Sequence, residues 1–272
     1  GQRLYRGEVS FNFVGRWKTW YIVSGIILLI SVGALVGRGL NLGIEFKGGA
    51  DFSLPAATCS VEEARTVSQA ETGAQTIVTI TGSGTVRVQT ETLTPAESSV
   101  VAGQLAQACG LVKEDIKYQV VGPTWGAEIS AKALQGLLVF LLFVTLFLTL
   151  YFEWRMALSA LVALAHDLLI TIGIYALIGL EVTPATVIGV LTILGYSLYD
   201  TVVVFDKVKE NTRGITGQSV LTYNEAANLA VNQTLIRSIN TSIVALLPVL
   251  SIIFVGAFLL GAETLLDLAV AL

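Results

Sequence analysis

The chain has 272 residues, of which 54% are hydrophobic and only 13% charged, with a net charge of -4. Soluble domains carry about a quarter of their residues as charged side chains, so this composition indicates that lipid surrounds much of the molecule. The sequence contains no basic run or stripe, which argues against a nucleic-acid partner.

Five apolar runs are each long enough, at about 17–25 residues, to cross a bilayer as a helix. A sixth run begins near Thr264 and stops at Leu272, so we expect an incomplete sixth span. The first run follows a basic tail and no A-x-A cleavage site comes after it, which predicts a retained anchor. The five complete spans are expected at 20–37, 134–152, 157–178, 186–204 and 240–258.

The predicted organisation is a cytoplasmic tail at 1–19, a first span at 20–37, a polar domain at 38–132 and the remaining spans at 133–272. Cytoplasmic loops carry an excess of Lys and Arg. With the N-terminus inside, every basic residue outside the polar domain faces the cytoplasm, which predicts an inner or plasma membrane protein with an extracytoplasmic domain. These residues are Arg3, Arg6, Arg16, Lys18, Arg155, Lys207, Lys209, Arg213 and Arg237.

The polar domain has the pattern of an α+β fold. A Gly-rich turn at 47–49 predicts a hairpin from Gly43 to Leu54. One helix is expected over 61–71, and a second begins at Thr94-Pro95, a typical N-cap followed by a typical first residue. Further strands are expected at 74–80 and 86–90, around Gly82-Ser83-Gly84, and at 116–121. This order contains a ferredoxin-like βαββαβ unit, so the fold class is a polytopic α-helical membrane protein with one ferredoxin-like domain.

The two cysteines flank the two helices of this domain. Cys59 lies just before the first helix and Cys109 at the end of the second. The helices of a ferredoxin-like layer run antiparallel, so these two ends are neighbours. Outside the cytoplasm a disulfide is permitted, and two interpretations stay open: a Cys59–Cys109 bridge, or two small buried hydrophobic side chains.

Asp200 lies inside the fourth predicted span. A charged side chain at the bilayer centre costs about 2.5–3.5 kcal/mol, so it is retained only with a partner, a cavity or a function. Lys207 follows at the cytoplasmic end of the same span, roughly 10 Å away at helical rise. Lipid favours the neutral carboxyl and a nearby cation the ionised one, which predicts a group that exchanges protons. The alternative is a hydrogen bond between helices.

Two further polar groups lie in or beside the predicted spans. His166 and Asp167 fall near mid-membrane, and His166 is the single histidine of the chain. They indicate either a proton relay or a satisfied contact between helices. Arg237 lies at the mouth of the fifth span within a polar run, 232–242, which predicts packing against a wet interior. By itself, Arg237 fits an interface residue whose head reaches water.

No motif for a cofactor, metal or nucleotide is visible. There is no G-x-x-x-x-G-K-[ST] loop, no H-E-x-x-H and no nucleophile with an adjacent base. We therefore expect a protein that is not an enzyme and that takes its energy from an ion gradient or from a partner.

Several stretches of the chain resemble motifs of the SecD/SecF family of bacterial export proteins. Residues 43–49, with Gly43, Glu45, Phe46, Gly48 and Gly49, resemble G-I-D-F-T-G-G, which opens the first extracytoplasmic domain in that family. Residues 195–206 resemble its fourth-span motif, G-Y-S-x-N-D-T-V-V-V-x-D. The matching residues there include Tyr196, Ser197, Asp200, Thr201 and Asp206.

The resemblance continues into the fifth span and also covers the third. Residues 232–238, with Gln233, Thr234 and Arg237, resemble N-Q-T-L-x-R-S/T, and Thr241-Ser242 follows as a T-S pair. Residues 166–167 resemble the H-D pair of the third span. Two positions depart from the pattern: Glu45 stands where Asp is usual, and Tyr199 where Asn is usual beside the key Asp. The last-span G-x-x-x-G-T-Y-S-S stretch is absent.

The resemblance runs from about Phe11 to the C-terminus and implies a role in protein export. Such proteins form SecD–SecF pairs of the resistance-nodulation-division superfamily, which use the proton motive force to complete export through the SecYEG channel. It implies that Asp200 binds the proton, with Arg237 as its basic companion. The implied partners are a SecD-like subunit, SecYEG, an unfolded exported polypeptide and membrane lipid. The alternatives are a small-molecule or lipid exporter of the same superfamily and a non-catalytic assembly protein.

Overall fold

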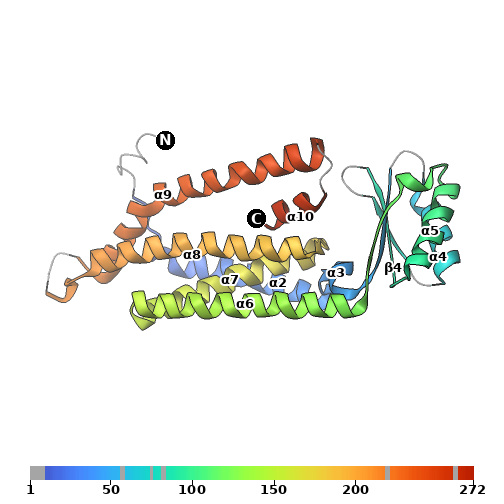
Figure 1. The fold of residues 1–272 in the computed structure, drawn as a ribbon. Helices are drawn as coiled ribbons and strands as arrows, with labels where there is room; N and C mark the ends of the chain where they lie inside the picture. The colour runs from blue at the N-terminus through green and yellow to red at the C-terminus, as the bar shows by residue number, and fades with distance from the viewer. Residues whose placement is uncertain (1–9, 56–58, 74–75, 81–83, 218–220, 260–262) are drawn as a thin grey trace.

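The computed structural model describes residues 10–55, 59–73, 76–80, 84–217, 221–259 and 263–272. Long helices form one bundle, and a small α+β domain lies at one end of it (Figure 1). Arg3, Arg6, residues 74–75 and the Gly82-Ser83 turn, which entered the predictions above, lie outside the described residues.

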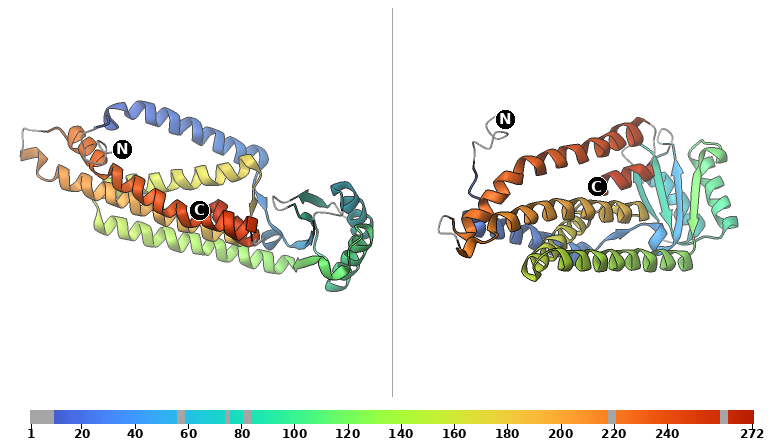
Figure 2. Two further views of the ribbon diagram at one scale, coloured as in Figure 1. Left: turned by 90° about the horizontal axis from the view of Figure 1, so that it is seen from above. Right: turned by 60° about the vertical axis from the view of Figure 1, so that its left-hand side comes forward.

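Within the described residues, five helices are long and apolar enough to cross a membrane, which is the predicted number of complete spans. In the bundle, α2 packs on α7, α7 on α8 and α8 on α9, while α6 contacts both α7 and α8 (Figure 2). Buried residues of α6, α7 and α8, such as Leu148, Leu164 and Leu194, form the core between them. The five helices are α2 (Trp17–Arg38), α6 (Pro123–Tyr151), α7 (Trp154–Ile178), α8 (Pro184–Thr212) and α9 (Tyr223–Ser251).

Two of these helices begin well before their apolar runs. Helix α6 starts at Pro123, which needs no hydrogen bond at the first helical position. Helix α9 starts after Thr222, whose side chain forms a capping box with Glu225. Because these local signals start the helices, the polar run around Arg237 lies inside α9 rather than at its beginning.

Pro248 interrupts α9 near its far end. A proline inside a helix removes one backbone hydrogen bond and crowds the preceding turn, so the chain adjusts its winding there. The backbone passes into the π-helix η4 (Ile252–Leu259) soon afterwards. The last helix, α10 (Glu263–Ala271), then packs against α8 (Figure 1).

The α+β domain, which we call the outer domain after its expected location, has the element order β-α-β-β-α-β. The longer order expected from the sequence contains this unit. Its four strands form an antiparallel sheet in the order β3-β4-β2-β5. Alternate residues of β2 and β4, such as Phe52 and Val88, are fully buried in a core shared with Leu105 of α5. The elements are β2 (Gly49–Leu54), α4 (Val61–Thr72), β3 (Ile77–Ile80), β4 (Val86–Thr90), α5 (Pro95–Ala108) and β5 (Lys117–Val121).

Cys59 and Cys109 form a disulfide in the structure, with their Cα atoms 4.8 Å apart. Cys59 precedes α4, and Cys109 is the C-cap of α5, whose end lies beside the start of α4. Of the two interpretations that the sequence left open, the structure has the bridge.

The predicted hairpin from Gly43 to Leu54 is wrong. Residues Ile44–Lys47 form the short helix α3, and strand β1 (Asn41–Leu42) pairs instead with β6 (Glu181–Val182) in parallel. Gly48 and Gly49 have φ of 79° and 151°, so they let the chain leave α3 and enter β2 directly. A Cβ on Gly49 would lie 2.7 Å from the Thr90 carbonyl, which leaves no room for a side chain.

Candidate functional site

The candidate site joins two pairs of consecutive residues from neighbouring helices. Tyr199 and Asp200 lie on α8, and Arg237 and Ser238 lie on α9. The Ser238 hydroxyl donates a hydrogen bond to the Asp200 carboxylate, with Oγ 2.6 Å from Oδ1. The guanidinium of Arg237 donates to the Tyr199 hydroxyl at 2.6 Å. Arg237 and Ser238 therefore each have a partner on α8.

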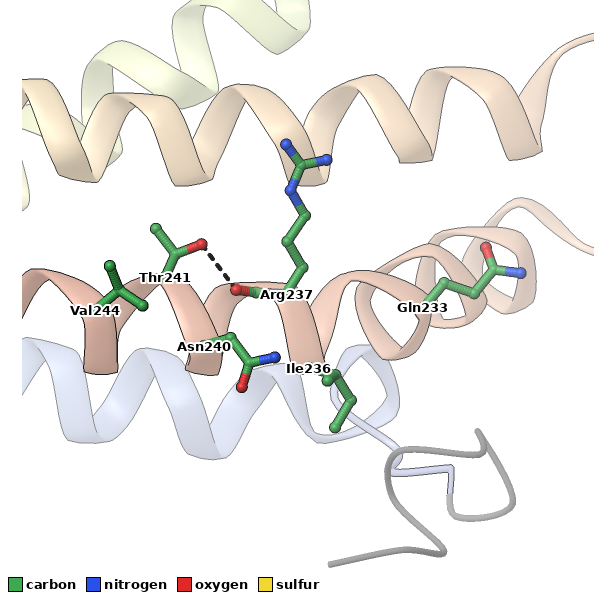
Figure 3. A pocket seen from close by; sticks show the side chains of 6 residues that line it. All are labelled: Gln233, Ile236, Arg237, Asn240, Thr241 and Val244. Atoms are coloured by element: carbon green, nitrogen blue, oxygen red, sulfur yellow. Dashed lines mark hydrogen bonds between the residues drawn. The ribbon is translucent and has the colours of Figure 1, made fainter.

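Arg237 does not pair directly with Asp200 among the described residues. Its guanidinium lies over the Tyr199 ring, 5.8 Å from the ring centre, which adds a cation–π contact to the hydrogen bond. Figure 3 shows the side chain reaching from α9 toward α8. Tyr199 is one of the two positions that depart from the motif, and its hydroxyl is the hydrogen-bond partner of Arg237.

An open pocket of about 550 Å³ lies along α9 at this point (Figure 3). Asn240 and Ile236 point away from Arg237, and the Thr241 hydroxyl donates to the Arg237 carbonyl at 2.8 Å. Amide, hydroxyl and aliphatic side chains line the pocket beside a charged group. Such a lining suits either water molecules or a neighbouring helix. Its lining residues are Gln233, Ile236, Arg237, Asn240, Thr241 and Val244.

A second polar cluster connects α2, α7 and α8. His166 Nε2 is hydrogen-bonded to the Ser24 hydroxyl at 2.7 Å, and its Nδ1 lies 3.1 Å from Asp167 Oδ1. The other carboxylate oxygen of Asp167 accepts a hydrogen bond from the Ser197 hydroxyl. These three helices are therefore joined by a chain of polar contacts within their membrane-spanning parts.

Ser197 and Asp200 lie on one face of α8, because residues three apart are neighbours on a helix surface. The His166–Asp167 cluster and the Asp200–Ser238 contact consequently approach α8 one turn apart. Both clusters therefore contact α8, one through Ser197 and the other through Asp200.

Several of the remaining motif residues donate hydrogen bonds within their own helices. Thr234 is buried and donates to the Ala230 carbonyl, as Thr201 does to Ser197 and Ser242 to Ser238. Gln233 accepts from Asn211, and Asp206 accepts from the Tyr151 hydroxyl at 3.2 Å. Tyr196 is 49% exposed in the isolated chain.

The Gly-Gly motif lies at the outer end of the bundle, away from Asp200. The amide of Gly43 donates to the Val182 carbonyl at 2.9 Å, next to the β1–β6 pairing. Close packing of α6 on α3 explains Gly126, since a Cβ there would lie 2.7 Å from the carbonyl oxygen of Phe46. One carboxylate oxygen of Glu45 is buried and has no hydrogen-bond partner among the described residues.

Sequence reasoning missed Ser24 and the ion pairs of Arg87 with Asp51 and Glu181. Serine is common in membrane helices, so its position in the first span gave no signal. Within the described residues, no group of three or more His, Cys, Asp or Glu side chains is placed to hold a metal ion.

Comparison with known proteins identifies the family. The model described as "Protein export membrane protein SecD/SecF, C-terminal" matches residues 101–272, and the model "SecD/SecF GG Motif" matches residues 33–55. The translocase subunit SecF of Streptomyces coelicolor is 50% identical, over 100% of this chain and 73% of the relative. That of Mycobacterium tuberculosis is 45% identical, over 98% of this chain and 63% of the relative.

A solved structure agrees with these sequence matches. The crystal structure of SecDF from Thermus thermophilus, described as a translocon-associated membrane protein, superposes with a TM-score of 0.82. It is 28% identical, and the match covers 97% of this chain and 36% of that chain. The helix bundle, the outer α+β domain and the motifs on α7, α8 and α9 therefore have one explanation: the chain belongs to the SecD/SecF family of protein-export membrane proteins.

Proposed function

We propose that the chain is the SecF part of a SecD–SecF complex, which uses the proton motive force to promote late steps of protein export. The single observation that carries this proposal is Asp200, a carboxyl group within an apolar helix of the bundle, held by the Ser238 hydroxyl of the next helix. Such a group is costly in lipid and marks proton and ion pathways in membrane proteins.

The proposed cycle starts with proton binding at Asp200. Protonation removes the charge that the Ser238 hydroxyl stabilises, so the α8–α9 contact changes its preferred geometry. The His166–Asp167 cluster of α7 contacts α8 at Ser197, one turn from Asp200, and relays protons or holds the helix during the change. A local change of charge that biases two arrangements of a packed element is an established kind of switch.

The proposed setting is a bacterial inner or plasma membrane with the N-terminus in the cytoplasm and residues 38–132 outside. α10 would be the start of a sixth span, and the outer domain a ferredoxin-like fold that contacts the emerging polypeptide. The proposed partners are a SecD-like subunit, the SecYEG channel, the exported chain and membrane lipid. The SecDF homologue of Thermus thermophilus, 31% identical over 97% of this chain, supports the SecD–SecF pairing.

The test replaces Asp200 with Asn, which keeps the shape of the side chain but cannot ionise. Export by membrane vesicles that carry a proton gradient should fall to the level of vesicles lacking the protein. The matched control is Glu210→Gln, the same chemical change on an exposed residue of the same helix.

Normal export by the Asp200→Asn variant at wild-type protein levels would contradict the proposal. That outcome would favour the assembly protein, in which buried polar residues only hold helices together. A small-molecule or lipid exporter predicts instead that polypeptide export is unchanged while transport of a small substrate is lost.

A further inference from the structure

A group of charged residues lies where the outer domain meets the bundle. Strand β4 of the domain carries Arg87, β2 carries Asp51, and Glu181 belongs to β6, which directly precedes α8. The short helix α3, which carries Glu45, lies beside the outer end of the bundle (Figure 1). We call the group formed by Glu45, Asp51, Arg87, Gln89 and Glu181 the outer joint.

Arg87 ties the outer domain to the segment before α8. Its Nε donates to Asp51 at 2.5 Å and its Nη1 to Glu181 at 2.5 Å. The three side chains are largely buried, with 22%, 10% and 17% of their surfaces exposed for Arg87, Asp51 and Glu181. Removing one partner of a buried ion pair leaves an uncompensated charge, so this bridge fixes how the domain sits on the bundle.

Glu45 lies in the same joint, and no side chain of the described residues donates a hydrogen bond to it. Gln89 donates to Glu181 at 2.9 Å and, at 3.4 Å, to Asp51, so the available donors serve the other two carboxylates. One oxygen of Glu45 is buried and has no hydrogen-bond partner in the described structure. A buried acceptor left in this way is costly when it is charged.

Glu45 and Glu181 share the space that a side chain on Gly43 would fill. A Cβ on Gly43 would lie 2.5 Å from an oxygen of Glu45 and 3.0 Å from an oxygen of Glu181. Gly43 has an ordinary φ of -65°, so the position needs glycine for room and not for backbone freedom. Two carboxyl groups this close repel each other when both are ionised.

The surrounding charges do not compensate Glu45. Besides Arg87, the groups that act on it are the carboxylates of Asp51, Glu181 and Asp267, the last from α10. On its own helix Lys47 is exposed to solvent. The ionisable residues near the start of the packed helix α6, Glu128 and Lys132, are also exposed.

We propose that Glu45 binds a proton, and that this proton holds closed the outer joint in which Arg87 ties the domain to Glu181. When Glu45 is neutral, its buried oxygen can lie beside Glu181. When Glu45 is ionised, the two carboxylates repel each other and α3 moves away from β6. The inference rests on the outer joint alone and does not require Asp200 to carry protons.

The direction of the pH dependence follows from burial. Burial raises the pKa of Glu45 above its ordinary 4.5, and the charges of Glu181 and Asp51 raise it further, against a backbone hydrogen bond and Arg87. The closed joint therefore binds the proton more tightly than the open one. The equilibrium constant for closing falls as the pH rises from 4.5 to the raised pKa, by about tenfold for each pH unit in that range.

Hydrogen exchange of the full-length protein in nanodiscs tests this proposal. The amides of residues 41–43 and 181–183, which join α3 to β6, should lose protection as the pH rises, relative to amides of α4 in the same sample. This measurement needs no variant. Unchanged relative protection between pH 4 and pH 8 would overturn the proposal.

The variants assign the effect to one carboxyl group. At pH 8, the Glu45→Gln variant should exchange at residues 41–43 more slowly than the wild type, and at pH 4 both should be equal. Glu128→Gln, the same change on an exposed residue of the neighbouring helix, should behave as wild type.

An Asp200→Asn background separates this inference from the proposed function. Retention of the pH transition in Asp200→Asn, together with its loss in Glu45→Gln, supports the outer joint even if export proves not to depend on Asp200. A transition that disappears in Asp200→Asn but persists in Glu45→Gln would overturn it.

Discussion

At the scale of single residues, the candidate site depends on which side chain is the hydrogen-bond partner of Asp200. Lipid demands a partner for a carboxyl group, and the partner is a hydroxyl, Ser238, rather than the adjacent cation. Arg237 is occupied by the Tyr199 hydroxyl and ring. The described partner of the Asp200 carboxylate on α9 is therefore a neutral donor.

Coupling between Ser238 and Asp200 is the first prediction at this scale. Hydrogen bonds between membrane helices contribute about 0.6 kcal/mol on average and at most about 1.7 kcal/mol. A double-mutant cycle of Ser238→Ala and Asp200→Ala, each of which removes the hydrogen bond, should give a coupling energy in this range when measured by thermal unfolding in detergent. The control is Ser242→Ala, because the Ser242 hydroxyl donates to the Ser238 carbonyl of its own helix, and it should be additive with Asp200→Ala. Additivity of both serine variants would argue against the contact.

At this scale the sequence singles out side chains that are out of place in their surroundings. Asp200, His166 and Arg237 stand out because an apolar helix has no reason to contain them unless they have partners. The outer joint could not be found in this way. Arg87 and Glu181 are 94 residues apart, and each lies in a polar stretch where a charged residue is expected.

At the scale of elements, local signals fixed the ends of helices and non-local pairing decided the strands. Thr94 and Pro95 start α5 with a capping box, as a typical N-cap and first residue predict. The chain around Gly43 resembled a hairpin because glycines follow a short alternating run. Its partner strand lies instead before α8, and no local pattern reveals such a pairing.

The contact between α2 and α7 gives a prediction about helix packing. A Cβ on Gly173 would lie 2.1 Å from the Cβ of Ser31, so the two helices meet at this glycine. Gly173→Ala should destabilise the bundle by about 1–3 kcal/mol through overpacking. Gly25→Ala on α2 is the control, since a Cβ there meets nothing within 4 Å and alanine favours a helix by about 1 kcal/mol. Thermal unfolding of both variants measures the difference, and equal stabilities would contradict this packing.

The disulfide gives a second prediction for the elements. Cys59 and Cys109 close a loop across 50 residues, for which chain entropy predicts a contribution of about 4 kcal/mol. Reduction, or the paired change to Ala, should increase hydrogen exchange in α4 and α5 while α7 and α8 keep theirs. Alkylation after reduction should add mass at two sites. A mass shift without reduction would show that the thiols are free in the native protein.

At the scale of the whole molecule, the apolar runs predicted the five long apolar helices of the described residues. Run length and composition were sufficient for this, because a bilayer restricts which helices can cross it. Sequence could not predict that α6 continues without a break from its polar start at the domain into the bundle. That continuity depends on how α6 packs on α3, which is a contact between distant segments.

Orientation in the membrane is the prediction at this scale. Glu114 before β5 and Glu153 before α7 are both exposed and lie at opposite ends of the molecule. In intact cells, an impermeant maleimide should label Glu114→Cys and should label Glu153→Cys only after lysis. The opposite pattern would place the outer domain in the cytoplasm and contradict the proposed orientation.

The pairing of β1 with β6 also constrains how the protein is made. Asn41 and Leu42 emerge early from the ribosome, but their partners, Glu181 and Val182, follow only after α6 and α7 have been synthesised. Until then Arg87 has Asp51 as a partner but lacks Glu181. The outer domain therefore reaches its final position on the bundle late in biogenesis. A nascent chain stalled before α8 should leave this unpaired interface accessible to proteases and chaperones.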